Sequence, residues 1–224
     1  MGAGAAGRAA RMSGTLHAPG AGAGAAGADH AFDVVFAVTG ARLPMGYEAA
    51  LWGALLGRLP WLADEPCVGV HAIRATSADG VLLLSRRTRL TLRLPLRRQD
   101  DVTRLSGQHL EVGGERLEVG AARSRPLEPY PTLSARFVAT GAADDLAHQE
   151  AVQAMLEELG MPVRFICGTM RTMRSGDVEV AGAEVVVHQL RPEQSLAMQE
   201  RGLGGGRHLG RGLFLPHKTI SDID

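Results

Sequence analysis

The chain has 224 residues, a length that suits one large domain or two domains of about 90 to 100 residues each. Its 24 basic and 24 acidic residues cancel, so bulk charge alone indicates no nucleic-acid partner. No run of eighteen apolar residues occurs, and a membrane span is therefore not expected.

Residues 1–30 are dominated by alanine and glycine, and we predict a disordered tail because so few large apolar groups cannot offset the entropy of ordering. The tail lacks the leucine-rich core and cleavage site of a secretory signal, and a start at Met12 is an open alternative. Cys67 and Cys167 form no metal-binding spacing, which favours reduced thiols in a cytoplasmic protein.

Residues 31–127 are predicted to form an N-terminal domain. A β-branched run at 32–38 predicts a strand, and apolar residues at helical spacing predict a helix over 46–59. The remaining elements are expected to be a strand at 67–73, an alternating strand at 80–95, a short helix at 96–107 and a hairpin at 109–127 turned at Gly113 and Gly114. This β-α-β-β-α-β order is typical of a ferredoxin-like domain.

Residues 132–224 are predicted to repeat this order in a second domain, after a proline-rich linker at 125–131. The expected elements are a strand at 132–140, a helix at 144–160, strands at 163–168 and 178–190, a helix at 191–204 and a last strand at 212–216. The predicted fold is α+β, with two tandem ferredoxin-like domains and a glycine-rich loop at 202–212.

The glycine-rich loop follows a helix and precedes a strand. Phosphate loops and dinucleotide loops need the opposite order, so a mononucleotide site is not expected. One interpretation is that the backbone of Gly205 and Gly206 approaches RNA phosphates, which Arg207, His208 and Arg211 neutralise. A simple long turn is the alternative.

Arginine supplies 23 of the 24 basic residues, a choice that suits phosphate recognition or reflects a GC-rich genome. Within 80–95, alternation predicts a basic stripe opposite the leucines, although a solvated sheet face is equally consistent. The candidate nucleic-acid contacts in this region and in the second half are Arg86, Arg87, Arg89, Arg93, Arg171, Arg174, His217 and Lys218.

Histidine is the residue type to consider for acid–base chemistry, because its pKa lies near neutrality. His71 lies in the apolar segment VGVHAI, where a structural role and a catalytic role both stay open. No HExxH, paired-cysteine or GxSxG motif occurs, so neither a metal nor another cofactor is expected.

The ordered set of motifs resembles the repeat-processing endoribonucleases of myxan-type (type I) CRISPR loci, within the repeat-associated RNA-binding superfamily. The matching stretches, spread over 32–219, are FDVVFAVTGARLP, ALWGALLGRLPWL, VGVHAIR, LLLSRRTRLTLRLP, ICGTMRT and GLGGGRHLGRGLFLPHK. The resemblance implies a metal-independent cut of the repeat stem-loop through 2′-hydroxyl attack, with a cyclic phosphate product. It also implies a protein that stays bound to the guide RNA among other effector subunits.

The resemblance also implies site residues. Relatives carry a histidine at the entry to the first helix, where this chain has Tyr47, and His71 matches the histidine of a GIHP-like segment in which Ala72 replaces proline. We therefore expect His71 to act as acid or base with Tyr47 as helper. The alternative is a catalytically weak or inactive RNA-binding subunit that caps the guide RNA hairpin.

Overall fold

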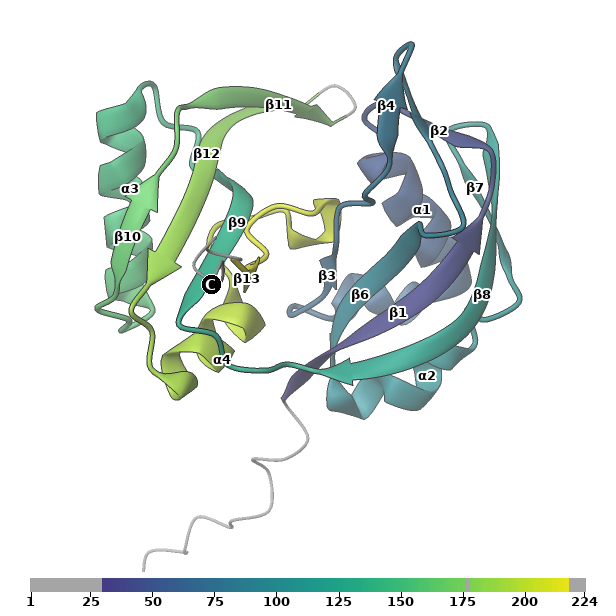
Figure 1. Cartoon of the computed structure of the whole chain (residues 1–224), viewed down its shortest axis with the longest axis horizontal. Helices are drawn as coiled ribbons and strands as arrows, with labels where there is room; N and C mark the ends of the chain where they lie inside the picture. The colour runs from purple at the N-terminus through teal and green to yellow at the C-terminus, as the bar shows by residue number, and fades with distance from the viewer. Residues whose placement is uncertain (1–29, 176–177, 218–224) are drawn as a thin grey trace, which may run out of the picture.

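The computed structural model describes residues 30–175 and 178–217. Two antiparallel sheets lie side by side, and the segment that follows the last helix runs between them (Figure 1). Lys218 and residues 1–29 of the predicted tail lie outside the described residues. None of the helices in the described ranges is both long and apolar enough to cross a membrane.

The first sheet has the strand order β3-β6-β1-β8-β7, with every neighbouring pair antiparallel. The elements of this half are β1 (Ala31–Thr39), α1 (Glu48–Arg58), η1 (Pro60–Asp64), β3 (Gly69–Val70), β6 (Arg89–Pro95), η2 (Leu96–Arg98), α2 (Gln99–Thr103), β7 (His109–Val112) and β8 (Glu115–Pro126). A small sheet of β2 (Arg42–Pro44), β5 (Val81–Leu83) and β4 (Thr76–Ala78) lies beside them. Apart from β7, which is the first arm of a hairpin, the chain order is that of a ferredoxin-like domain.

The second sheet has the order β10-β12-β9-β13, and β11 pairs with β12 outside this path. The elements of this half are β9 (Thr132–Ala139), α3 (Asp145–Glu158), β10 (Arg164–Cys167), β11 (Arg171–Ser175), β12 (Val178–His188), α4 (Pro192–Arg201), η3 (Arg207–Leu209) and β13 (Leu215–Pro216). The main strands of the two halves have equivalent spatial orders, with the first strand of each half between the third and the last. The predicted tandem ferredoxin-like fold is therefore confirmed.

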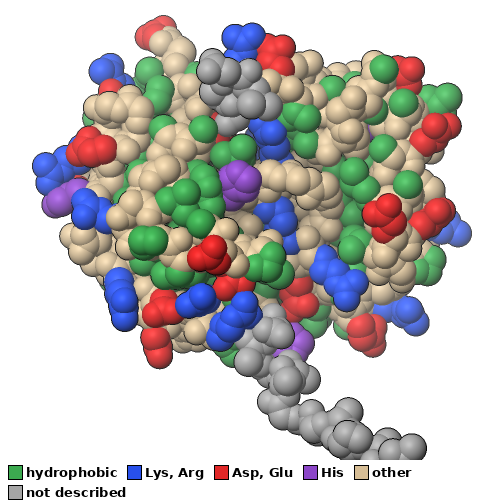
Figure 2. Space-filling view, turned by 180° about the vertical axis from the view of Figure 1, so that it is seen from behind, with side chains coloured by type: hydrophobic (Ala, Val, Ile, Leu, Met, Phe, Trp, Pro, Cys, Tyr) green, Lys and Arg blue, Asp and Glu red, His purple; other side chains and the backbone are tan. Residues whose placement is uncertain are grey.

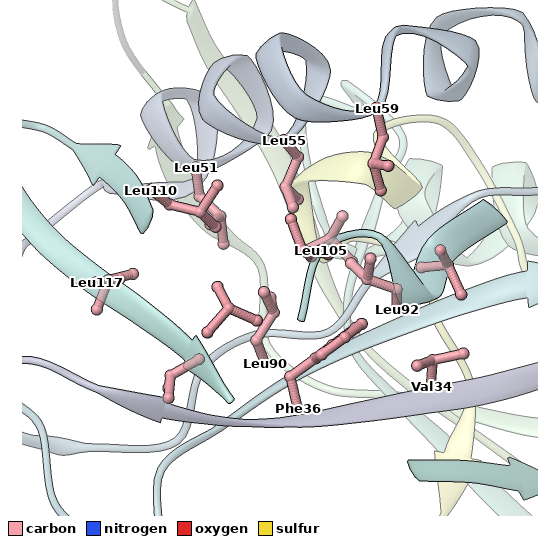
Figure 3. Packing of buried hydrophobic residues seen from close by; sticks show 14 of the residues in the cluster. Val34, Phe36, Leu51, Leu55, Leu59, Leu90, Leu92, Leu105, Leu110 and Leu117 are labelled. Carbon is pink, nitrogen blue, oxygen red and sulfur yellow. The ribbon is translucent and has the colours of Figure 1, made fainter. Parts of the chain in front are cut away.

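Helix α1 packs on one face of the first sheet (Figure 3). Leu51 and Leu55, four residues apart, place their side chains on the same face of the helix. They lie over Phe36 of β1 and Leu90 and Leu92 of β6, and all five side chains are fully buried. Each buried leucine contributes about 1.5–3 kcal/mol relative to an exposed one. This packing fixes the entry to α1 and the loop after it above the sheet.

Several predicted elements differ from the observed ones, and the last strand, predicted over 212–216, is reduced to Leu215–Pro216. The predicted strand 80–95 is broken, because a turn between Ser85 and Thr88 separates β5 from β6; the two residues exchange hydrogen bonds of 2.9 Å. The predicted strand 67–73 is reduced to Gly69–Val70, and its pairing with β6 ends after one further backbone hydrogen bond at His71. The predicted hairpin turn is confirmed at Gly113 and Gly114, which have φ values of 60° and 85°.

Candidate active site

The face of the first sheet that points away from α1 packs against the second half of the chain. Phe32 and Val34 point toward α1, so Asp33 between them points to the opposite face. Arg93 of β6 is its register partner on this face. The Arg93 guanidinium also donates to the carbonyl oxygens of Gln199 and Phe214, at 3.0 Å each. One arginine thus joins the two halves.

Asp33 and Arg93 form a bidentate ion pair, with Nε–Oδ1 and Nη2–Oδ2 distances of 2.8 and 3.1 Å. Both side chains are 1% exposed. The prediction of a basic stripe is therefore wrong at Arg93, because the second half covers that face of the sheet. Arg86, Arg87 and Arg89 remain exposed.

His71 lies beside this ion pair, just after β3. Its backbone N–H donates to the carbonyl of Thr91 at 2.9 Å, which continues the β3–β6 contact by one residue. Its Nε2 lies 3.3 Å from Oδ1 of Asp33, which is within ion-pair distance. The two atoms do not, however, meet the geometry of a hydrogen bond. The side chain of His71 is 10% exposed.

Burial and neighbouring charges set the protonation of the two groups. Burial opposes ionisation of Asp33, but His71 and Arg93 outweigh it and hold the pKa of this carboxyl well below its usual range. Burial lowers the pKa of His71, and the Asp33 carboxylate offsets this only in part. At neutral pH the pair is therefore a neutral imidazole beside a carboxylate.

His71 opens on a cavity of about 280 Å³, here called the basic pocket. Four arginines line it together with His71 and the edge of β13: Arg74, Arg87, Arg89 and Arg125. On the face shown in Figure 2, which is opposite to the view of Figure 1, basic side chains and a histidine lie close together near the middle of the molecule. A histidine facing several guanidinium groups provides a site for a phosphate group next to an acid–base residue.

Sequence reasoning missed Asp33, Arg74 and Arg125. Asp33 is the only charged residue within the apolar run 32–38, and that isolated charge is the signal that marks it. Arg125 follows from register, since β8 places it opposite Asp33, to which it donates from Nη2 at 2.9 Å. No comparable signal identifies Arg74.

Tyr47 and His71 line the same small cavity, together with His208 of the glycine-rich loop. The Tyr47 hydroxyl accepts a hydrogen bond of 2.6 Å from the N–H of Ile73, two residues beyond His71. Burial raises the pKa of Tyr47 to about 12. The hydroxyl thus stays protonated at neutral pH and holds the segment that carries His71.

The glycine-rich loop packs closely on itself and on the first half. A Cβ on Gly212, whose φ is +63°, would lie 1.9 Å from the carbonyl oxygen of Leu203. Gly210, with φ +78°, lies against the backbone of Val70 and Ala72 next to His71. The glycines therefore permit backbone contacts that bring His208 to the site.

Arg207 and Arg211 do not extend to solvent as expected, because both side chains are buried. Arg207 donates to the carbonyls of Glu200, Arg201 and Cys67, and so caps the C-terminal end of α4. Within the described ranges, Nε and Nη2 of Arg211 have no hydrogen-bond partner. Contact of these two residues with RNA stays a prediction.

The remaining predicted contacts do not line the basic pocket. Arg171 donates to the carbonyl of Arg136 at 2.7 Å, and exposed Arg174 pairs with Glu179. His217 is half-buried after β13. Over residues 30–175 and 178–217, no group of three or more His, Cys, Asp or Glu side chains is placed to hold a metal ion.

Comparisons with known proteins agree with this architecture. The family model described as "Cas6 Crispr" matches residues 32–219. A curated protein of Myxococcus xanthus (strain DK1622), the CRISPR-associated endonuclease Cas6, is 37% identical over 185 residues, which cover 82% of this chain and 80% of that protein.

Solved structures share the fold at low sequence identity. A CRISPR-associated protein Cas6 has a TM-score of 0.59 and 12% identity, covering 84% of this chain and 100% of its own. A Cas6-related protein from Pyrococcus furiosus has a TM-score of 0.56 and 14% identity, covering 86% and 100%.

Proposed function

Since the chain belongs to the Cas6 family of CRISPR-associated proteins, we propose that it is an endoribonuclease that binds the stem-loop of a CRISPR repeat transcript and cuts it at one site. The observation that carries this proposal is the placement of His71 between Asp33 and the four arginines of the basic pocket. An imidazole oriented by a carboxylate is a suitable general base, and guanidinium groups stabilise the charge of a phosphorane.

The proposed reaction needs no metal. Asp33 favours the His71 tautomer that carries its proton on Nε2, which leaves the Nδ1 lone pair to accept the proton of the 2′-hydroxyl. The 2′ oxygen then bonds to phosphorus, the bond from phosphorus to the 5′ oxygen breaks, and a 2′,3′-cyclic phosphate forms. The leaving 5′ oxygen takes a proton from Tyr47, which suits donation because it stays protonated at neutral pH.

The experiment that tests this reaction is cleavage of the repeat RNA from the same genome in EDTA. We expect cleavage to continue in EDTA, to stop when the nucleotide before the cut carries 2′-deoxyribose, and to leave a cyclic phosphate. A requirement for magnesium, or cleavage of the 2′-deoxy substrate, would contradict the proposed mechanism.

The second candidate function is an RNA-binding subunit that caps the guide RNA hairpin and cuts slowly or not at all. The buried Tyr47 favours it, because a hydroxyl with a pKa of about 12 cannot act as the base at the position where relatives carry histidine. If activity was lost there, Tyr47→His should raise the cleavage rate. An unchanged rate in that variant counts against this candidate.

We further propose that the protein stays on its product RNA and joins other effector subunits. Co-purification of the tagged chain from its own cells should then recover mature guide RNA together with effector proteins. Recovery of the chain alone, free of RNA, would contradict retention without affecting the cleavage proposal.

A further inference from the structure

A second cavity, of about 420 Å³, lies between the first half and the glycine-rich loop, and here it is called the tryptophan pocket. Trp52 of α1 and His208 of the loop form one wall, with ring centroids 5.0 Å apart and planes tilted by 43°. The other lining residues come from η1, from the segment that follows it and from 204–207. The mechanism proposed above makes no use of this pocket.

The walls of the tryptophan pocket suit a flat heterocycle. The half-buried indole of Trp52 provides an aromatic surface. The backbone N–H groups of Gly204, Gly205 and Gly206 donate to no other described residue, so they are available to the acceptor edge of a ligand. A Cβ on Gly205 would meet nothing within 4 Å, which indicates open space above this backbone.

The charges around the tryptophan pocket favour a base over a phosphate group. Arg207, the arginine that lines it, donates to three backbone carbonyls within the fold. The carboxylate of Glu65 also lines the pocket, and it pairs with Arg97 and Arg98 at 2.6 and 3.2 Å. The four arginines of the basic pocket offer a phosphate a better site.

The tryptophan pocket is connected to the candidate active site through shared residues. His208 lines both the tryptophan pocket and the small cavity with Tyr47 and His71. His71 in turn lines both the small cavity and the basic pocket. A base in the tryptophan pocket therefore belongs to a nucleotide close to the phosphate that is cut.

We propose that the tryptophan pocket binds one unpaired RNA base next to the scissile phosphate, stacked on Trp52 beside His208. This inference rests on the proposed function, because it requires that the chain binds RNA. Base–aromatic stacking predicts that loss of the base or of the indole weakens binding about 5- to 150-fold.

The test is a set of repeat RNAs in which each nucleotide near the cut is replaced in turn by an abasic one. In the unaltered protein, one position within two nucleotides of the cut should show the loss of affinity. Trp52→Ala should bind the intact RNA more weakly by a similar factor and show no further loss with that abasic RNA. Trp52→Phe should restore the difference between intact and abasic RNA.

Trp61→Ala is the matched control, since Trp61 lies outside the tryptophan pocket and stacks with Arg98 at 4.7 Å. This variant should lose affinity for the abasic RNA by the same factor as the unaltered protein. If Trp52→Ala also loses affinity for the abasic RNA by that factor, the inference is wrong while the proposed function stands. If the unaltered protein fails to bind intact repeat RNA, the proposed function is wrong and this inference loses its premise.

The chain has two tryptophans, which allows a second, direct measurement. In Trp61→Phe, Trp52 is the only tryptophan, and repeat RNA should quench its fluorescence. The abasic RNA identified above should leave the fluorescence unquenched at concentrations that saturate binding. Equal quenching by both RNAs would overturn the inference even if Trp52→Ala failed to fold.

Discussion

Asp33 and Arg93 face each other in register on β1 and β6 and form a buried bidentate ion pair. Arg93 also donates hydrogen bonds to two carbonyl oxygens of the second half. Removing one partner of such a pair leaves a buried charge without compensation. The same carboxylate lies beside His71. The contact that joins the two halves therefore also positions the proposed catalytic residue.

Arg93→Met should lower the free energy of unfolding by about 3–5 kcal/mol, because Asp33 loses its main partner. Urea denaturation measures this difference. Arg86→Met is the matched control; its exposed side chain predicts a change within about 0.5 kcal/mol. Equal effects of the two variants would show that the buried pair does not stabilise the contact between the halves.

Stability should depend on pH through His148, whose side chain is fully buried. Burial lowers its pKa, and Asp145 offsets this only in part. Below its ordinary pKa of 6.5 the unfolded chain binds a proton that the folded chain does not, so stability falls as pH falls toward the folded pKa. Urea unfolding between pH 7 and 5 should show this loss, and His148→Gln should reduce it. An unchanged pH dependence in His148→Gln would contradict the assignment.

Tyr47→Phe removes the acceptor for the N–H of Ile73 and leaves this buried group unpaired. The expected cost is about 1–3 kcal/mol of the free energy of unfolding. Cleavage of repeat RNA should also slow, because the proposed proton donor is lost. Stability is measured by urea denaturation and cleavage in single-turnover reactions. A variant as stable and as fast as the unaltered protein would rule out both roles.

Gly212→Ala should destabilise the chain by about 2–5 kcal/mol, since an added Cβ would meet the Leu203 carbonyl and φ is positive. Gly205→Ala is the control, because a Cβ there meets nothing within 4 Å. Thermal unfolding measures the melting temperatures of the two variants. A similar melting temperature for both would contradict the close packing of the loop.

The order of helices and strands, and with it the fold, could be predicted from the sequence, because the apolar periodicity that marks each element is a local property. The break at Ser85–Thr88 escaped prediction, since leucine-rich residues continue on both sides of the turn. Burial of Arg93 also escaped prediction, because alternation along a strand distinguishes two faces but cannot tell which face the second half of the chain covers. The contact between Asp33 and His71 depends on the pairing of β1, β6 and β3, which are far apart in sequence.

The most direct test of the account is the single-turnover rate at which His71→Ala cuts repeat RNA in EDTA, compared with the unaltered protein under saturating protein. Loss of a general base predicts a rate lower by about 10²- to 10⁴-fold, with RNA binding retained. An unchanged cleavage rate in His71→Ala would contradict the assignment of the active site.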